Sequence, residues 1–303
     1  MSTKEIYKQY VESDPGLPLF FQPQWLDLYQ TPWQVIMAEE LDQRMFLIYF
    51  EERKMVFRFI RNPQGTPYHG ILPSRNCSPE MIQKLACKLL QQLPDYDELH
   101  IDLLPGLVLT EVSPFKIKQR RTNILTLTDK SDLFNHFKPS LQRQIRKAQR
   151  HLSIEEHHDH HAFFTLYETS LKQRRVNEFL SETILQKIIT FCKEAHCGKL
   201  FRVYDREQQV HATLLLVFDK VRAYYLLGGT DKQFNGSGAM SYLMWHAIQY
   251  ACDLGLKEFD FEGSDQDSIH RFFQNFNPKV VCYTNLQHQP SKVLKQLRKW
   301  QQH

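Results

Sequence analysis

The chain has 303 residues, of which 42% are hydrophobic and 24% are charged, and its formal net charge at pH 7 is +4. This length suits two domains with separate cores, and the composition excludes a disordered, collagen-like or repeat protein. No apolar run approaches the length needed to cross a bilayer, and the N-terminus carries Lys4, Glu5 and Glu12 in place of an apolar signal segment. We therefore expect a soluble, cytoplasmic protein.

The first half of the sequence predicts one α/β domain over residues 1–128. Strand-like runs lie at 45–50 and 55–60, around a turn at 51–54, and further strands lie at 98–103 and 122–127. Ser78 and Pro79 begin a helix that runs to about Leu93, with apolar residues at every fourth position from Met81. A helix placed between strands is typical of an α/β domain.

The second half, residues 129–303, contains the positive charge excess and predicts a second α/β domain. The expected helices are a basic helix from Pro139 and helices at 162–173, 181–195 and 239–254, and the expected strands are 152–155, 200–204, 211–218, 221–227, 259–261 and 280–286. The tail from Ser291 is basic and helical in pattern, with an apolar stripe of Val293, Leu294, Leu297 and Trp300. We expect this stripe to dock on the protein itself, although a membrane surface would also suit it.

A glycine-rich loop, Gln233-Phe234-Asn235-Gly236-Ser237-Gly238, joins a predicted strand to the helix that begins at Ala239. Such a loop leaves backbone N–H groups unpaired beside the positive end of the helix dipole, which favours phosphate. It lacks the Lys-Ser/Thr pair of an ATP-binding loop and the GxGxxG spacing of a dinucleotide site. The loop therefore predicts a phosphate or pyrophosphate cradle, and a plain turn with a helix cap is the alternative.

The glycine loop and its surroundings resemble the GNAT acyltransferases, in particular the Fem-like branch with two GNAT domains in one chain. The resemblance rests on Gln233 to Gly238, on Gly228-Gly229-Thr230-Asp231, on Phe259-Asp260-Phe261-Glu262-Gly263-Ser264 and on the basic segment Gln142 to Ala148. It covers most of residues 130–288. It implies two GNAT-like domains, each a mixed, mostly antiparallel sheet flanked by helices, and the first of them lacks a cofactor loop.

The resemblance also implies an N-acyltransferase that moves an acyl group, acetyl by preference, from acyl-CoA to an amine without an acyl-enzyme. Gln233, Gly236, Ser237, Gly238 and Ala239 would then hold the pyrophosphate of acyl-CoA as co-substrate. A backbone N–H near Leu227 or Gly228 would polarise the thioester carbonyl. The acceptor would be a small-molecule amine, such as a cell-envelope or nucleotide-linked precursor.

Four cations mark the basic helix. Arg143, Arg146, Lys147 and Arg150 are spaced i, i+3, i+4 and i+7, which places them on one face. The apolar residues Leu141, Ile145 and Ala148 occupy another face, so the helix can dock while it presents its charges. We expect an anionic ligand there, and the resemblance favours an acceptor or carrier with phosphates; a merely solvated face is the alternative.

Two carboxylates follow the strand after the glycine-loop helix, where α/β proteins place ligand-contacting groups. An amine that attacks a thioester must lose a proton, and a carboxylate with a raised pKa could accept it, directly or through water. Glu262 is the preferred base and Asp260 the alternative, with Ser264 nearby. Either carboxylate could instead cap the next helix or pair with Arg271.

No metal site is expected. The tract His157-His158-Asp159-His160-His161 lies between a strand and a helix, where a polar loop belongs. The six cysteines are scattered without CxxC pairs, which indicates reduced, buried thiols.

Two other functions remain open. A Fem-type enzyme would take an amino acid from charged tRNA and add it to a peptidoglycan precursor, although no sustained heptad pattern between residues 129 and 199 predicts the coiled-coil arm that many such proteins carry. A catalytically silent GNAT fold would instead use its basic helix to bind RNA or an anionic partner.

Overall fold

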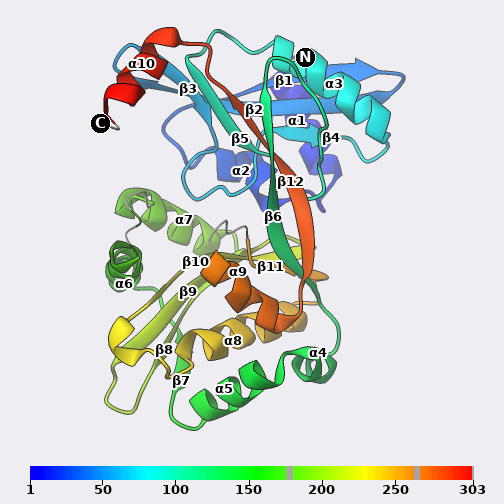
Figure 1. Ribbon diagram of the computed structural model, residues 1–303. Helices are drawn as coiled ribbons and strands as arrows, with labels where there is room; N and C mark the ends of the chain where they lie inside the picture. The colour runs from blue at the N-terminus through cyan, green and yellow to red at the C-terminus, as the bar shows by residue number, and fades with distance from the viewer. Residues whose placement is uncertain (175, 177–179, 263–266, 302–303) are drawn as a thin grey trace. The chain divides into compact units, whose positions relative to one another are not determined.

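The computed structural model describes residues 1–174, 176, 180–262 and 267–301, and it divides the chain into two compact units (Figure 1). The first unit combines Met1–Arg121 with Val281–His303, and the second is Thr122–Val280. The sequence had placed everything after residue 128 in the second domain. The C-terminal strand and helix belong instead to the first unit, because strand pairing joins segments that are distant in sequence.

The first unit contains a mixed sheet in the order β1-β2-β3-β5-β12, with β4 paired to β2. Its strands are β1 (Trp33–Glu40), β2 (Gln43–Lys54), β3 (Phe57–Arg61), β4 (Ile71–Pro73), β5 (Glu98–Asp102) and β12 (Lys279–His288). Neighbours are antiparallel except β3 and β5, which are parallel. A parallel pair needs a crossover, and α3 (Pro79–Gln91) lies between these two strands in the chain.

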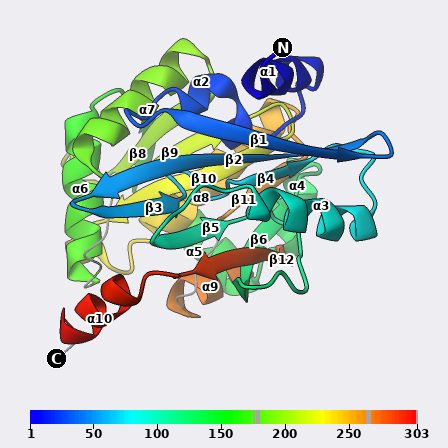
Figure 2. The ribbon, with the colours of Figure 1, turned by 90° about the horizontal axis from the view of Figure 1, so that it is seen from above.

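Helices cover both faces of this sheet. Alternate side chains of β2 point to opposite faces, so Met45, Leu47 and Tyr49 join the core beneath α3. On the other face, Tyr7 of α1 (Thr3–Ser13) packs edge-on against Phe46 and Trp33 at ring centroid distances of 5.2 and 5.6 Å. Figure 2 shows α1 and α3 on opposite sides of the β1–β2 pair. The short helices η1 (Leu19–Phe21) and α2 (Pro23–Leu26) complete this part of the unit.

The second unit contains a mixed sheet in the order β6-β11-β10-β9-β8-β7. Its strands are the end of β6 (Lys116–Thr126), β7 (Ser153–Glu156), β8 (Gly198–Tyr204), β9 (Val210–Phe218), β10 (Arg222–Thr230) and β11 (Glu258–Asp260). Neighbours are antiparallel except β10 and β11, which are parallel and have α8 (Ala239–Asp253) as their crossover. Both sheets are thus mixed and mostly antiparallel, as expected from the sequence.

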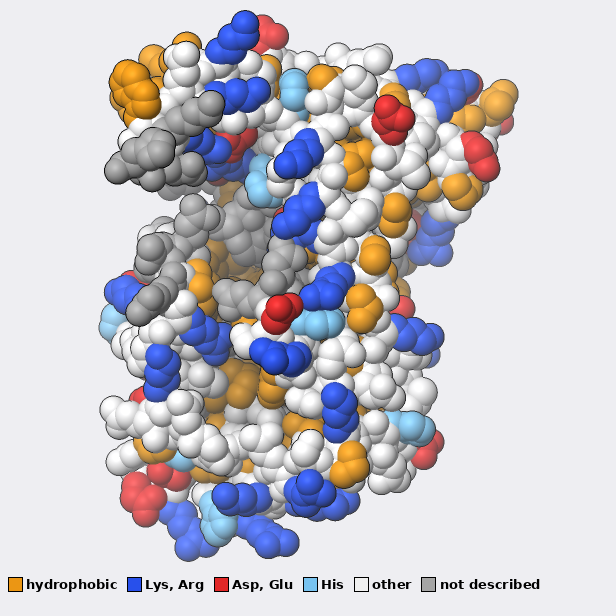
Figure 3. Space-filling view, viewed as in Figure 1, with side chains coloured by type: hydrophobic (Ala, Val, Ile, Leu, Met, Phe, Trp, Pro, Cys, Tyr) orange, Lys and Arg blue, Asp and Glu red, His pale blue; other side chains and the backbone are white. Residues whose placement is uncertain are grey.

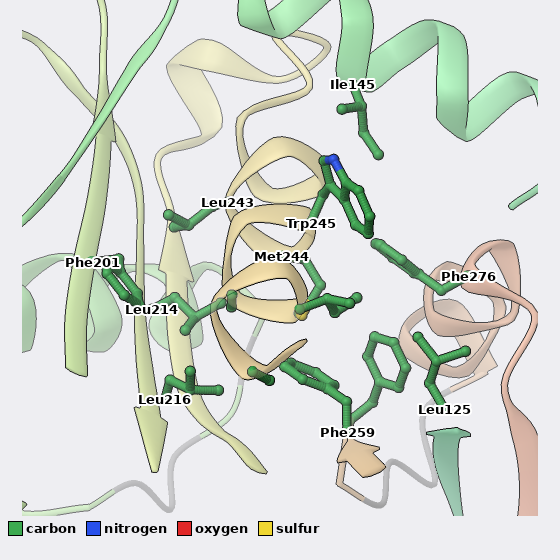
Figure 4. Close-up of a cluster of buried hydrophobic side chains, with 14 of the residues drawn as sticks. Leu125, Ile145, Phe201, Leu214, Leu216, Leu243, Met244, Trp245, Phe259 and Phe276 are labelled. Carbon is green, nitrogen blue, oxygen red and sulfur yellow. The ribbon is translucent and has the colours of Figure 1, made fainter. Parts of the chain in front are cut away.

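The core of the second unit lies between this sheet and α8. Leu214 and Leu216 of β9 and Phe201 of β8 face Leu243 and Met244 of α8 (Figure 4). On its other side, α8 packs against α5 (Pro139–Gln149), whose Leu141, Ile145 and Ala148 are buried as expected. The remaining helices are α4 (Lys130–His136), α6 (His160–Gln173), α7 (Glu182–Glu194), α9 (Asp267–Phe273) and η3 (Gln274–Phe276).

The tail forms α10 (Lys292–Gln301), which departs from the expected docking. Leu294 is buried, whereas Val293, Leu297 and Trp300 are exposed, Trp300 at 79%. No helix within the described ranges is long and apolar enough to span a membrane. All six cysteines are free; Cys192 is buried as expected, but Cys282 is exposed.

Candidate active site

The glycine loop follows β10 and has the backbone geometry that the sequence indicates. Asp231 Oδ1 accepts a hydrogen bond from the Gln233 N–H at 2.9 Å and fixes the short helix η2 (Lys232–Phe234). Gly236 and Gly238 have φ angles of +89° and +79°, in the left-handed region where glycine carries no Cβ penalty. Gly238 is also the N-cap of α8, and no side chain caps it.

The free backbone donors of this loop differ in part from those expected. The Ser237 N–H donates to the Phe234 carbonyl at 3.0 Å, and the Ala239 N–H donates to Ser237 Oγ at 3.2 Å. The first bond of α8 runs from the Tyr242 N–H to the Gly238 carbonyl. Within the described part of the chain, the N–H groups of four residues therefore keep no protein acceptor: Gly236, Gly238, Met240 and Ser241.

A small cavity of about 140 Å³ lies over the loop. Gln144, His211 and Phe272 contribute to its walls, together with the backbone from Phe234 to Ser241. The His211 ring stacks on Phe234 at a centroid distance of 3.7 Å, which holds that side of the loop in place. The cavity and its free N–H groups form a setting for an anion of phosphate size.

Strands β10 and β11 separate beside the loop. They pair at only three positions, which end at Tyr224 and Asp260, while β10 continues to Thr230. The pairing of β10 with β9 shifts between Tyr225 and Leu227, which marks a β-bulge. Because successive N–H groups of a strand point to opposite sides, some backbone donors after Tyr224 face the side that β11 has left, and Leu227 and Gly228 lie in this stretch.

The two glycines at the end of β10 allow close approaches. A Cβ at Gly228 would stand 2.3 Å from the Tyr225 hydroxyl oxygen, so only glycine lets this hydroxyl lie against the strand. A Cβ at Gly229 would stand 2.8 Å from Cα of Tyr167, so α6 crosses β10 nearly backbone to backbone. These contacts bring Tyr225 and Tyr167 to the place where β10 and β11 separate.

Asp260 is fully buried at the end of β11, with hydrogen bonds to one carboxylate oxygen and an ion contact at the other. Its Oδ1 accepts from the Thr122 hydroxyl at 2.6 Å and from the Glu262 N–H at 2.8 Å. Its Oδ2 lies 3.7 Å from Nη1 of Arg222, which also donates to Glu258. This arrangement favours a structural role for Asp260, which fixes the backbone that carries Glu262.

Glu262 has the features of a proton acceptor. Its backbone is left-handed, with φ of +59°, a conformation that non-glycine residues adopt at a cost. Its Oε1 is buried and has no hydrogen-bond partner among the residues described. Burial, together with the charge of Asp260, raises the pKa of the Glu262 carboxyl well above its usual range.

Two tyrosines share the electrostatic environment of Glu262. Burial raises the pKa of Tyr225 to about 12; Arg174 opposes this shift, whereas Glu262 and Tyr167 add to it. Burial likewise raises the pKa of Tyr167, with a further contribution from Glu262. Both hydroxyls therefore keep their protons at neutral pH, so the site pairs a buried carboxylate with phenolic proton donors.

The four cations of α5 are all exposed, as their spacing indicates. The guanidinium of Arg146 lies over the Phe134 ring at 5.2 Å, and Arg143, Lys147 and Arg150 face solvent. Figure 3 shows Lys and Arg side chains gathered at the lower edge of the second unit, where Figure 1 places α5. The helix also reaches the start of α8, because Gln144 Oε1 accepts from the Ser241 hydroxyl at 3.0 Å, and it approaches the glycine loop, because a Cβ at Gly238 would stand 2.9 Å from Gln144 Cγ.

Gly263 and Ser264, which the sequence analysis singled out, fall outside the described residues. The histidine tract makes local contacts of its own. Asp159 of the histidine tract caps α6, since its Oδ1 accepts from the Ala162 N–H at 2.9 Å, and His161 contacts Glu182. Across the described ranges, no group of three His, Cys, Asp or Glu side chains is placed to hold a metal ion.

The sequence analysis missed Gln144, Tyr167, Arg174 and the role of Tyr225. Tyr225 packs on Phe273 at a ring distance of 6.0 Å, as an aromatic residue of a strand commonly packs in a core. The alternation of polar and apolar residues in a strand shows which face of the strand is buried. It does not show which residues of other elements contact that face. The sequence did contain a signal for Gln144, because this residue lies inside the basic segment Gln142 to Ala148.

A family profile described as an acetyltransferase (GNAT) domain matches residues 135–270, which contain the loop, α5 and Glu262. Among solved structures, a crystal structure of FemX aligns over 98% of both chains, with a TM-score of 0.68 and 15% identity. The structure of L-PGS from Bacillus licheniformis aligns over 96% of this chain and 94% of its own, with a TM-score of 0.54 and 10% identity.

The C-terminal domain of a putative lysylphosphatidylglycerol synthetase from Agrobacterium fabrum gives a TM-score of 0.52 at 11% identity, over 94% of this chain and 92% of its own. At these identities the structures show the fold alone. No curated protein matches the sequence. Residues 135–270 therefore match the acetyltransferase (GNAT) family profile, and the whole chain has a fold similar to that of FemX.

Proposed function

We propose that the second unit is an N-acyltransferase that moves an acyl group, acetyl by preference, from acyl-CoA to an amine. The observation that carries this proposal is the position of Glu262. A buried carboxyl with a raised pKa follows the end of β11, beside the separated strands and at the sheet edge that also bears the glycine loop. The carboxyl edge of an α/β sheet is the usual place for ligand and catalyst to meet.

The loop would hold the diphosphate of acyl-CoA. The free N–H groups of Gly236, Gly238, Met240 and Ser241 supply donors, and the start of α8, a helix of 15 residues, adds the positive end of its dipole. A free N–H of the stretch that contains Leu227 and Gly228 would polarise the thioester carbonyl. These roles need backbone atoms, which explains why glycine recurs where the ligand would approach.

Glu262 would accept the proton that the amine loses as its nitrogen bonds to the acyl carbon. The carbon–sulfur bond breaks in the same reaction, and the departing thiolate needs a proton. Tyr225 can supply it, because its hydroxyl is protonated at neutral pH and lies against Gly228. General acid and base groups of this kind contribute about 10²- to 10⁴-fold each to rate.

The cations of α5 point to an acceptor that carries phosphate, such as a cell-envelope or nucleotide-linked precursor. Arg143, Arg146, Lys147 and Arg150 are exposed, and their helix contacts the glycine loop through Gln144. Removal of a phosphate-contacting cation should weaken acceptor affinity and its salt dependence while it leaves donor affinity unchanged.

A second candidate is aminoacyl transfer from charged tRNA to a peptidoglycan precursor, in the manner of Fem-type proteins. The alignment with FemX over 98% of both chains favours it. In that reaction Glu262 and Tyr225 would keep their roles, since an amine still attacks an activated carbonyl. The donor would differ, and the loop would then contact a phosphate of the tRNA.

Isothermal titration with acetyl-CoA separates these candidates. The proposal predicts one equivalent bound by the wild-type protein, followed by release of free thiol once a suitable amine is added. No binding at any accessible concentration would reject acyl-CoA as donor. Binding of aminoacyl-tRNA with transfer would then support the second candidate, and steeply salt-dependent RNA binding without turnover would indicate a silent GNAT fold.

A further inference from the structure

The first unit contains a cavity of about 540 Å³ that none of the roles above uses. We name it the α10 cavity, because α10 forms one wall while β5, β12 and the start of β6 form the others. Its lining residues are Glu98, Leu99, His100, Pro114, Lys116, Gln287, His288, Gln289, Pro290, Lys295 and Arg298. This volume lies within the usual range of small-molecule sites, about 300–1,000 Å³.

The charges around the α10 cavity are predominantly positive. Lys116 comes from β6, whereas Lys295 and Arg298 come from α10, so the cations lie on two different elements. Glu98, the single carboxylate among the described lining residues, is already held by Arg61 and by Arg298, whose Nη2 donates to it at 3.1 Å. Lys116 and Lys295 are exposed and form no ion pair with a described residue, so their charges are available to a ligand.

One neutral polar group of the cavity is a donor without a partner. The Nε2 of Gln289 is buried and has no hydrogen-bond partner in the described part of the chain, which is costly unless a ligand or water accepts from it. The Tyr96 hydroxyl lies 2.8 Å from Nδ1 of His288, and burial raises the pKa of Tyr96 to about 12. The Tyr96 hydroxyl and Nδ1 of His288 therefore satisfy each other.

The pKa of His288 is consistent with a positive electrostatic potential in the α10 cavity. Burial lowers the pKa of His288, and the charge of Lys295 lowers it further. A positive potential that disfavours a protonated imidazole favours an anion in the same space.

We propose that the α10 cavity binds a small molecule with two or more phosphate groups, at a site separate from the acyl-transfer site of the second unit. A polyphosphate can contact cations on β6 and on α10 at once and accept from Gln289, whereas the volume leaves room for an organic group. This inference does not depend on the proposed function, because every residue in it belongs to the first unit.

Titration with inorganic diphosphate tests the α10 cavity. The glycine loop could also bind this probe, so the protein used is Gly236→Asp, in which the added carboxylate repels phosphate from the loop. We expect about one equivalent of diphosphate to bind. On this background, Lys295→Glu should weaken the affinity at least about tenfold, or about 1.4 kcal/mol.

Lys292→Glu is the matched control, because Lys292 is exposed on the same helix but does not line the cavity. It should change the affinity by less than about twofold, whereas Lys116→Glu, on the opposite wall, should behave like Lys295→Glu. Absence of diphosphate binding to the Gly236→Asp protein would overturn the proposal. Equal weakening by Lys292→Glu and Lys295→Glu would overturn it as well, since that pattern reports net charge alone.

Discussion

The two units contain the same strand–helix–strand crossover, and only one of them is open to a ligand. In the first unit β3, α3 and β5 form it, and in the second β10, α8 and β11 do. Each parallel pair has three paired positions, which end at Arg61 with His100 and at Tyr224 with Asp260. The crossovers can therefore be compared residue by residue.

The helix starts differ in their free donors. In α3, Ser78 Oγ accepts from the Met81 N–H at 3.2 Å, and Pro79 has no N–H at all. In α8, Gly238 stands at the N-cap without a side-chain oxygen, and the Met240 and Ser241 N–H groups have no partner within the described ranges. The first helix satisfies more of its own end, whereas the second leaves two N–H groups for an anion.

The strand ends differ in the same way. Two residues after the last pair stand Asp102 in the first unit and Glu262 in the second. Asp102 accepts from Arg120 at 2.7 Å and from Asn285 at 2.9 Å. Glu262 Oε1 has no such partner among the described residues, and its pKa is raised. The comparison teaches that the same crossover leaves groups available to a ligand only where its own chain does not satisfy them.

The largest expected effect is on turnover, in a comparison of Glu262→Gln with Asp102→Asn. Loss of the general base should lower kcat about 10²- to 10⁴-fold, with acetyl-CoA affinity unchanged. Asp102→Asn should leave kcat per folded molecule unchanged and instead cost about 1–2 kcal/mol of stability, because a partly buried ion pair with Arg120 is lost. Steady-state kinetics and urea unfolding measure the two effects.

If Asp102→Asn lowered kcat as much as Glu262→Gln does, the proposed division of roles between the units would be wrong. The pH profile gives a second check. A base with a raised pKa must be deprotonated to act, so kcat should rise with pH through that pKa in the wild type.

Next in size is the loss of donor binding in Gly236→Asp, with Gly106→Asp as the matched control. Gly106, in the first unit, has φ of +87°, nearly that of Gly236, and a Cβ at either position meets no atom within 4 Å. Both substitutions therefore carry a similar backbone strain. Titration should show an affinity loss of about a hundredfold or more for Gly236→Asp, about 2.7 kcal/mol, and wild-type affinity for Gly106→Asp.

A smaller effect is expected for Asp260→Asn. The substitution removes the charge opposite Arg222, although Arg222 keeps Glu258 and the Oδ1 hydrogen bonds can persist. Unfolding in urea should show a loss of about 2 kcal/mol. Unchanged stability together with lost activity would instead assign the proton transfer to Asp260.

The smallest effect is the pH dependence of stability that Glu262 contributes. Its folded pKa is raised above its unfolded value, so its contribution is fully present below the unfolded pKa and is lost as pH rises toward the folded pKa. The wild type should therefore lose stability relative to Glu262→Gln over this window, by at most about 1.4 kcal/mol per pH unit. A constant difference in unfolding free energy between the two proteins across the window would contradict the raised pKa.

The sequence predicted local structure better than it predicted contacts between residues that are distant in sequence. The segment from Ser78 to Leu93 carries its own cap and periodicity, and α3 forms there with the expected N-cap. The glycine loop likewise carries its signal in two glycines, Gly236 and Gly238, that both have positive φ. Both features depend on short-range backbone chemistry, which a sequence displays directly.

Long-range contacts could not be predicted in this way. The strand after Pro278 was assigned to the second domain, yet its Asn285 and Leu286 pair with β5 of the first unit. The position of Tyr225 beside Glu262 depends on Gly228 and on the approach of α6, which no periodicity encodes. The partners of Asp260 were invisible for the same reason, since Thr122 and Arg222 are far from it in sequence.

The central claim is that the loop of the second unit holds the diphosphate of acyl-CoA through its free backbone N–H groups. Amide resonances in ¹⁵N-labelled protein test it directly during titration with acetyl-CoA. The account predicts that Gly236, Gly238, Met240 and Ser241 shift most, while Glu80 and Met81 at the start of α3 remain unchanged. Saturable binding that leaves those four resonances in place, or that shifts the α3 amides equally, would contradict it.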